Sequence, residues 1–219
     1  MGILSRIRAA LHPSPPGEEG FTAVQPIPAA DNRFGVDIWD CRAFTHNMVS
    51  TTASPEIARR YVELRSSQGN EYQGQTPTNA HVVTCNLTYA FSQRPSDGPL
   101  FKSEQMEDKW DIYLFDDELY FARSWTGELT FKARVRYEPG ALYITALAAE
   151  ENHDPAFALR VVDYLVKTHV LRHEAPHPLP STLPPTPRDV AVFSFSLFGR
   201  RCSFGTYADT ISMQSSASP

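Results

Sequence analysis

The strongest alternation of hydrophobic and polar positions lies between residues 109 and 149. Three turn signals interrupt it, at Asp116-Asp117, Thr126-Gly127 and Pro139-Gly140, and runs of β-branched and aromatic residues lie between these turns. Runs of this kind, bounded by turn residues, are typical of antiparallel strands. We therefore predict a four-stranded antiparallel meander over residues 109–149.

The register of the middle hairpin follows from its turn. A three-residue loop at Trp125-Thr126-Gly127 gives Gly127 the left-handed conformation that such loops need. It also pairs apolar residues with apolar residues, whereas a two-residue loop would pair them with charged ones. Since a slip of one residue moves every side chain to the other face, we predict the three-residue loop. The predicted pairs are Phe121 with Phe131, Leu119 with Ala133 and Arg123 with Leu129.

The same register places the basic residues Lys132, Arg134 and Arg136 on the opposite, more hydrated face, and we take them as a candidate partner surface. A nucleic-acid platform interleaves aromatic residues with basic ones on a single exposed face. Here alternation places Tyr137 on the other face, and the formal net charge of -5 disfavours a polyanion. We predict no nucleic-acid partner.

Two helix starts share one signal, a capping residue followed by proline at the first helical position. They are Ser54-Pro55 and Asp154-Pro155, and they predict helices near residues 55–67 and 155–173. Further strands are predicted, from β-branched and aromatic content, over residues 34–39, 80–91 and 190–198, with a possible edge strand over residues 202–207.

These elements predict an α+β fold, an antiparallel sheet of about six strands with two helices packed on one face. We assign residues 1–33 to a short N-terminal helix and a Pro-rich linker. Residues 34–211 are expected to form a single domain, and residues 212–219 a disordered tail. The Pro-rich stretch 175–188 is expected to be an extended crossover or a flap.

Composition bounds the compartment and the cofactors. The three cysteines lack metal-site spacing, and no apolar run is long enough to span a membrane. We expect a cytoplasmic protein without cofactor, metal site or stable membrane insertion. Residues 3–11 have the pattern of a basic amphipathic helix, which either docks on the protein or lies on a membrane surface.

The most specific candidate site is Arg123, Ser124 and Trp125. The predicted register places Arg123 on the apolar face near the end of the sheet, where a guanidinium needs a carboxylate, an anionic ligand or an aromatic ring. Together with Trp125 it suggests an anion or aromatic ligand. The alternative is a structural arginine paired with an acid such as Asp37 or Asp40.

Other clusters carry weaker signals. Four histidines lie close in sequence, and two of them have the i, i+4 spacing of metal ligands, but the HExxH pattern is absent. His81 and Cys85 lie about 13 Å apart in a strand, too far for a nucleophile pair. The acidic run 116–118 is typical of a turn. The four histidines are His153, His169, His173 and His177.

The function hypothesis depends on the lack of catalytic motifs and on apolar residues that we expect to be exposed. No nucleotide-binding loop or hydrolase elbow is present. We expect a non-catalytic protein-binding domain of accessory, adaptor or immunity type, with a protein partner or a second copy bound near Trp125 or an apolar edge strand. That strand carries Phe193, Phe195, Leu197 and Phe198. The alternative is a small-molecule binding protein or small hydrolase-like enzyme with a pocket near Arg123.

Overall fold

The computed structural model describes residues 18–151 and 153–211, which form two compact units. Unit 1 comprises residues 54–104 and 110–159, and unit 2 comprises the other described residues. That residues 34–211 form a single domain stays a prediction. Residues 1–17 and 212–219, with the predicted N-terminal helix and tail, lie outside the described residues. Of the helices in the described part, none has the length and apolar character needed to cross a bilayer.

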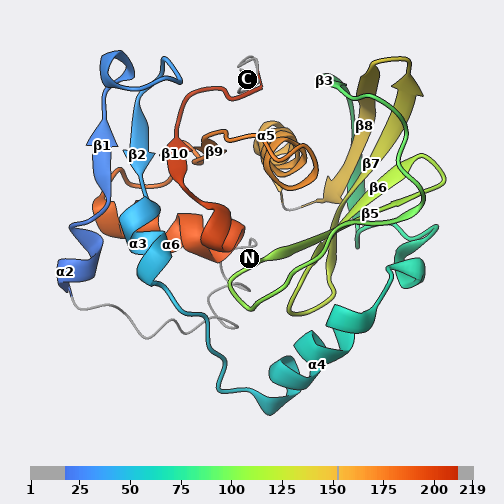
Figure 1. Ribbon diagram of the computed structural model, residues 1–219, viewed down its shortest axis with the longest axis horizontal. Helices are drawn as coiled ribbons and strands as arrows, with labels where there is room; N and C mark the ends of the chain where they lie inside the picture. The colour runs from blue at the N-terminus through green and yellow to red at the C-terminus, as the bar shows by residue number, and fades with distance from the viewer. Residues whose placement is uncertain (1–17, 152, 212–219) are drawn as a thin grey trace. The chain divides into compact units, whose positions relative to one another are not determined.

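Unit 1 contains a six-stranded antiparallel sheet, and the predicted α+β fold class and central meander are confirmed (Figure 1). Its order is β3-β8-β7-β6-β5-β4, so β3 and β4 are the edges. The strands are β3 (Ala80–Ala90), β4 (Gly98–Phe101), β5 (Trp110–Phe115), β6 (Glu118–Arg123), β7 (Leu129–Glu138) and β8 (Ala141–Glu150).

The β6–β7 register agrees with the prediction away from the turn and differs beside it. Phe121 lies opposite Phe131, as predicted, and Leu119 lies opposite Ala133. Nearer the turn, Ala122 pairs with Leu129, because β7 carries one extra residue at this point. The predicted pairing of Arg123 with Leu129 is therefore wrong. A bulge adds one residue to one strand and cannot be recognised from alternation alone.

Backbone hydrogen bonds close this turn around Arg123. The Arg123 amide donates to the Glu128 carbonyl over 2.9 Å, and the Gly127 amide donates to the Arg123 carbonyl over 2.8 Å. Gly127 has φ +71°, the left-handed conformation expected for it.

The sixth strand is not the one that the sequence suggested. Residues 98–101, for which no strand was predicted, form β4, while residues 190–198, expected to be a strand, belong to α6 (Pro187–Phe198). Thr186 caps α6, its hydroxyl accepting from the Asp189 amide over 3.2 Å, and Pro187 follows at the first position. This is the start signal recognised at the other two helices. The alternation of Phe and Ser over residues 193–196 obscured it.

Helix α4 (Pro55–Ser66) confirms the first predicted helix. The Ser54 hydroxyl accepts from the Ile57 amide over 3.3 Å. The helix buries Tyr61 and Leu64, and the Tyr61 ring lies 6.5 Å from the Trp125 ring between centroids. Helix α4 therefore packs beside the β6–β7 turn.

The segment that follows α4, residues 69–75, covers β5 and β6. The Tyr72 ring lies 5.3 Å from the Tyr113 ring between centroids, and the Gly74 amide donates to the Tyr120 hydroxyl over 3.0 Å. Gly69 has φ +85° and lies against the Tyr113 ring, where a Cβ would overlap it. Tyr113, which lies under this segment, is fully buried, and the other residues of β5 are buried as well.

Helix α5 (Pro155–Leu165) continues as a π-helical turn over Val166–Val170. Its cap is as predicted, since the Asp154 carboxylate accepts from the Phe157 amide over 2.7 Å. The π-helical turn ends at Val170, close to the predicted helix end at residue 173.

Unit 2 contains a smaller, four-stranded sheet in the order β1-β2-β10-β9. Strand β1 lies in the segment expected to be a linker, and β9 lies in the expected flap. Strand β10 is flanked by β2 and β9, so the expectation of an edge strand there was wrong. The strands are β1 (Gln25–Ile27), β2 (Ile38–Asp40), β9 (His177–Pro178) and β10 (Phe204–Thr206). The remaining helices are α2 (Glu18–Phe21), α3 (Arg42–Asn47) and the 3-10 turns Ala29–Asp31, Asn70–Tyr72 and Gly199–Arg201.

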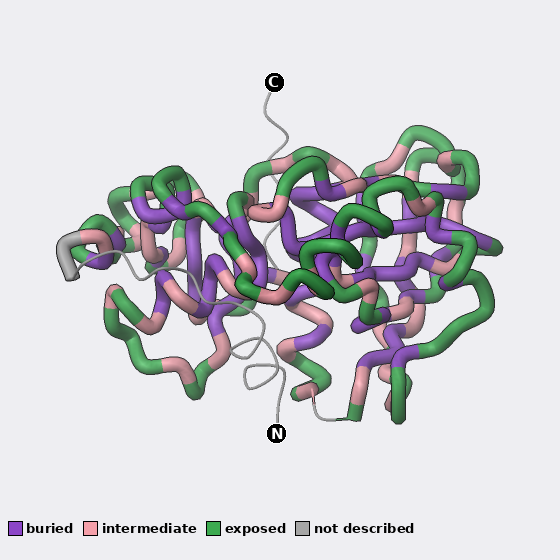
Figure 2. Tube along the Cα trace, turned by 90° about the horizontal axis from the view of Figure 1, so that it is seen from below, coloured by how far each residue is buried: buried purple, intermediate pink, exposed green. Residues whose placement is uncertain are grey.

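Aromatic side chains of α3, α5 and α6 fill the core of unit 2. Phe44 meets Phe195 edge to face at 6.4 Å, and Tyr164 meets Phe198 at 4.8 Å between ring centroids. Phe193, Phe195, Leu197 and Phe198 are all buried. The exposed apolar strand that we expected to carry a partner surface is thus absent here, and Figure 2 shows how buried and exposed stretches alternate along the chain.

Candidate functional site

Arg123 lies inside unit 1 against an aromatic ring. Its guanidinium carbon lies 4.6 Å from the centroid of the Trp110 ring, within cation–π range. Burial lowers the pKa of Arg123 to about 10, and the nearby Glu128 carboxylate opposes the shift. Of the two acids suggested as partners, Asp40 is held by Arg42 at 2.7 Å, and Asp37 accepts from the Ala29 amide. An aromatic ring is one of the three environments that we expected for the Arg123 guanidinium.

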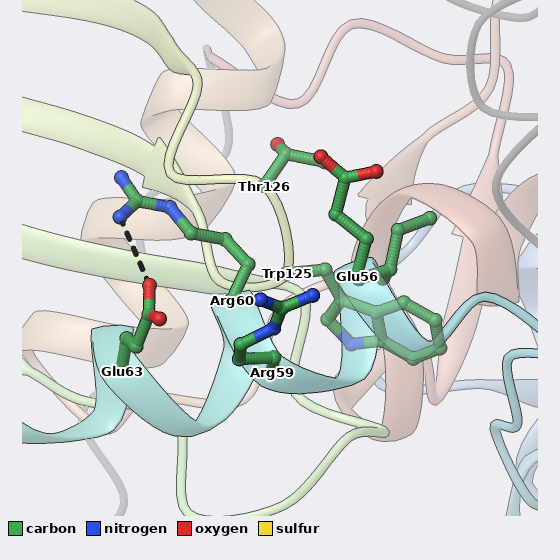
Figure 3. Close-up of a pocket in the computed structure, with 7 residues that line it drawn as sticks. Glu56, Arg59, Arg60, Glu63, Trp125 and Thr126 are labelled. Carbon is green, nitrogen blue, oxygen red and sulfur yellow. Dashed lines mark ion pairs between the residues drawn. The ribbon is translucent and has the colours of Figure 1, made fainter.

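Of the three candidate ligand residues, Trp125 lines a groove between α4 and the β6–β7 turn. Ser124 and Trp125 are both buried, with 1% and 5% of their surface exposed. The edge of Trp125 reaches this groove, which has a volume of about 460 Å³ (Figure 3). Arg123 does not line it. The lining residues are Glu56, Ile57, Arg59, Arg60, Glu63, Trp125 and Thr126.

The groove beside Trp125 has balanced charge. It contains two arginines and two glutamates, and Arg60 lies 3.6 Å from Glu63 in an ion pair (Figure 3). Exposed pairs of this kind are worth about 0–1 kcal/mol and are screened by salt. Its lining includes no cysteine, histidine or serine, and its carboxylates are those of Glu56 and Glu63.

A second groove, of about 960 Å³, lies in unit 2. Its acids are already engaged: Asp40 accepts from the Arg42 guanidinium at 2.7 Å, and Glu107 accepts from the Ser50 amide at 2.7 Å. Burial would raise the pKa of Asp40, but the hydrogen bonds from Arg42 outweigh it and hold that pKa below its ordinary value. Asp40 is therefore an ionised acid whose charge Arg42 compensates.

A Ser–His contact that the sequence did not reveal lies in the core of unit 2. The His177 Nε2 and the Ser194 Oγ are 2.6 Å apart, on β9 and α6. Both residues are 0% exposed, and the His177 Nδ1 has no hydrogen-bond partner. A catalytic pair needs an acid at that nitrogen and access for substrate. Burial also lowers the pKa of His177 to about 3, so the imidazole is neutral.

The cysteine beside this pair is equally unreactive. The Cys41 thiol lies 3.9 Å from the Ser194 hydroxyl, and burial raises the pKa of Cys41 to about 12. Since the thiolate is the reactive form, such a thiol is inert. We interpret Cys41, His177 and Ser194 as a buried polar contact in the core.

The remaining histidines of the candidate group are separated. His169 is buried, with its Nδ1 2.8 Å from the Thr168 hydroxyl. Burial, with Arg201 and Arg172 nearby, places its pKa well below the ordinary value. His153 lies edge-on to Phe131 at 5.5 Å between centroids. Across residues 18–151 and 153–211, no three metal-ligating side chains gather in one place.

The basic stripe on β7 is largely neutralised by neighbours in the sheet. Lys132 pairs with Glu118 at 2.7 Å. Arg136 pairs with Glu138 and lies 4.4 Å from the centroid of the Tyr143 ring. Arg134 is exposed. The three residues do share the hydrated face, but two of their charges are compensated, so as a partner surface the stripe stays a prediction.

The outer edge of β3 is a candidate binding surface that the sequence did not reveal. This strand has eleven residues and contains no charged residue and no proline. In the part of the chain that the structure describes, it is hydrogen-bonded to β8 alone. Along one face every side chain is exposed, and Val82 keeps 69% of its surface in contact with solvent. The exposed residues are Val82, Thr84, Asn86, Thr88 and Ala90.

Comparisons with protein-family models, with curated proteins and with solved structures found no match to this chain.

Proposed function

We propose that this chain is a non-catalytic protein-binding protein, of accessory, adaptor or immunity type, that binds an extended segment of its partner at the edge strand β3. The observation that carries the proposal is the length and composition of this edge. On the outer side of this eleven-residue strand, the alternate residues whose amides and carbonyls point away from β8 have no neighbouring strand in the described structure.

Strand addition accounts for these features in physical terms. An unpaired edge offers a ladder of backbone donors and acceptors, and a bound strand satisfies them while side-chain contacts give specificity. Sheet proteins ordinarily protect long edges with lysine, proline or a covering segment. β3 has neither lysine nor proline, and its exposed valine and threonines suit a pleated neighbour.

The enzyme alternative has less support. Arg123, which would have held an anionic ligand, packs on Trp110 and does not reach the groove beside Trp125. The Ser194–His177 contact is enclosed in the core of unit 2. The chemistry expected near Arg123 therefore lacks a described cavity in which to occur.

The proposal is tested by capture with two matched valine variants. Tagged wild-type chain is used to capture proteins from a lysate of the source cells, and the bound proteins are identified by mass spectrometry. Val82→Lys on β3 is expected to lose the specific partner. Val62→Lys, which changes a valine on α4 with a similar exposed fraction of 66%, is expected to retain it. A partner retained by Val82→Lys, or lost equally with both variants, would contradict binding at β3.

A further inference from the structure

We infer that the segment which pairs with β3 is β3 of a second copy of this chain, arranged antiparallel about a two-fold axis that passes through Cys85. This inference rests on the proposed function, since it names the partner at the same edge. It predicts one continuous sheet that runs through both copies.

The position of the axis follows from the length of the strand. β3 runs from Ala80 to Ala90, so its midpoint is Cys85. A two-fold axis at the midpoint of an antiparallel pair brings every residue of the strand opposite a residue of the other copy. Any other register leaves backbone groups at both ends without a partner. The register centred on Cys85 therefore forms the longest ladder.

This register also matches side chains of the same kind. Because paired positions add up to an even number, exposed residues meet exposed residues and inward-facing residues meet inward-facing ones. β-Branched and aromatic partners of this type each contribute about 0.2–1 kcal/mol. The pairs are Val82 with Thr88, Thr84 with Asn86, Val83 with Leu87 and His81 with Tyr89.

The irregularity in β3 falls on the axis itself. Its pairing with β8 shifts between Thr84 and Leu87, where β3 carries one extra residue. On either side the strand is regular, as residues 80–84 and 87–90 follow a constant register with β8. In the dimer one regular half of each copy lies against the other half of its partner, and the bulge occupies only the centre.

Charge does not oppose pairing with a second copy. Around the axis the two halves of β3 face each other, so like charges in both halves would repel across the pair. β3 contains neither lysine nor glutamate, although the whole chain carries 20 basic and 25 acidic residues. The net charge of -5 on each copy is screened beyond about 10 Å at ordinary salt.

The test uses a pair of charge designs that depend on the register. Residues 82 and 88 of different copies face each other, whereas within one copy they are about 20 Å apart. Val82→Lys with Thr88→Lys places like charges opposite each other twice per dimer, and the dissociation constant is expected to rise by about tenfold or more. Val82→Glu with Thr88→Lys places opposite charges there, and the dissociation constant is expected to remain within a few-fold of wild type. Sedimentation velocity over a dilution series measures both, with Val62→Lys as the surface-charge control.

Cross-linking at Cys85 tests the axis directly. Opposed residues of an antiparallel pair have Cα atoms about 4.5–5.5 Å apart, within reach of a short bis-maleimide. Because burial raises the pKa of Cys85, the reaction is run at a pH high enough to form its thiolate. Wild type is then expected to yield a covalent dimer and Cys85→Ser none. The other two cysteines, Cys41 and Cys202, are buried and serve as an internal background.

Three outcomes overturn the inference: a wild-type monomer throughout the dilution series, a dimer that the two-lysine variant does not weaken, and a dimer that is not cross-linked through Cys85. A monomer that still captures a partner protein through Val82 would remove the dimer and leave the proposed function standing. A dimer with the predicted register and no captured partner would support the second copy as the occupant of the edge.

Discussion

The two edges of the six-stranded sheet are built in opposite ways. β4 has only four residues, starts at Gly98 with φ +124° and carries Pro99, which cannot donate a ladder hydrogen bond. Its register with β5 also shifts after Pro99. β3 has eleven residues without proline or charge. The same sheet therefore ends at β4 in a way that discourages pairing and at β3 in a way that permits it.

The burial of side chains near the two edges also differs. Beside β4, β5 is buried at all six positions, and residues 69–75 cover the face that carries Tyr113 and Tyr120. β3 alternates, with exposed residues on one face and buried or half-buried ones on the other. The shortness of β4 and the segment over residues 69–75 together shield the β4 edge of the sheet. The β3 edge keeps the exposed surface that a partner would need.

The largest effect is expected where the cover meets β5. Gly69→Ala adds a Cβ that overlaps the Tyr113 ring at a backbone φ of +85°. Strain and overpacking together should lower the free energy of unfolding by about 3 kcal/mol. Gly74→Ala is the control, because its φ is +76° but no atom lies within 4 Å of the added Cβ. It should cost about 1 kcal/mol. Urea unfolding measures both, and equal losses would show that the cover over Tyr113 does not matter.

Acid should destabilise unit 2 most, because burial lowers the pKa of both His177 and His169 there. Burial lowers the pKa of His177 from 6.5 to about 3, so the folded protein keeps a neutral imidazole while the unfolded chain takes up a proton below about pH 6.5. The contribution is complete above that pH and is lost as the pH falls towards 3. At about pH 4.5 the loss is about 2–3 kcal/mol.

The measurement is an NMR titration of the imidazole with hydrogen exchange at the same pH values. The groups that face His177 are the Ser194 hydroxyl and the rings of Tyr164 and Phe198. Exchange is expected to rise first in β9 and α6, while β5 to β7 stay protected. An imidazole that titrates near 6.5 would contradict the prediction.

A smaller loss is expected from the partly buried residue Arg123. Arg123→Ala removes its contact with the Trp110 ring and leaves space in a packed region, which should cost about 2 kcal/mol. Arg134→Ala, an exposed arginine on β7, should change stability by less than about 0.5 kcal/mol. Thermal unfolding with a library of small anions is the check. An anion that stabilises wild type but not Arg123→Ala, with equal melting of the two unliganded proteins, would instead make Arg123 a ligand residue.

The smallest change in stability is expected at the open edge. Val82 is exposed, so Val82→Lys should alter the free energy of the folded monomer by less than about 0.5 kcal/mol. The measurement is urea unfolding at a protein concentration below that at which copies associate. A larger loss would mean that Val82 packs within its own chain, and the contrast between the two edges would weaken.

Local signals in the sequence were enough for the meander and for the helix caps. The turn at Gly127 and the pairing of Phe121 with Phe131 depend on alternation and on one left-handed residue, which are properties of neighbouring positions. The caps at Ser54 and Asp154 are equally local. The helix over residues 187–198 was missed because it is buried on most sides and its sequence is therefore a short apolar run. A short apolar run is equally compatible with a buried strand and with a buried helix.

The site residues were harder to predict because their environment is not local. Arg123 was expected on the apolar face, and its contact with Trp110 agrees with this. The identity of the ring could not be predicted, because Trp110 lies on β5 and only the register between β5 and β6 brings it opposite Arg123. The contact of His177 with Ser194 joins β9 to α6 across 17 positions without a motif. The openness of β3 depends on which strand lies last in the sheet, and only the topology reveals this.

The composition of β3 has a consequence for handling the protein at high concentration. A run such as Val82 to Leu87 combines strand-forming residues with low charge and lacks the proline or lysine that would limit aggregation. During refolding, when many chains expose this segment at once, it offers a template for uncontrolled stacking as well as for an ordered pair. Assembly at this edge would therefore also act as a form of self-protection, and dilute refolding should give a higher soluble yield than concentrated refolding.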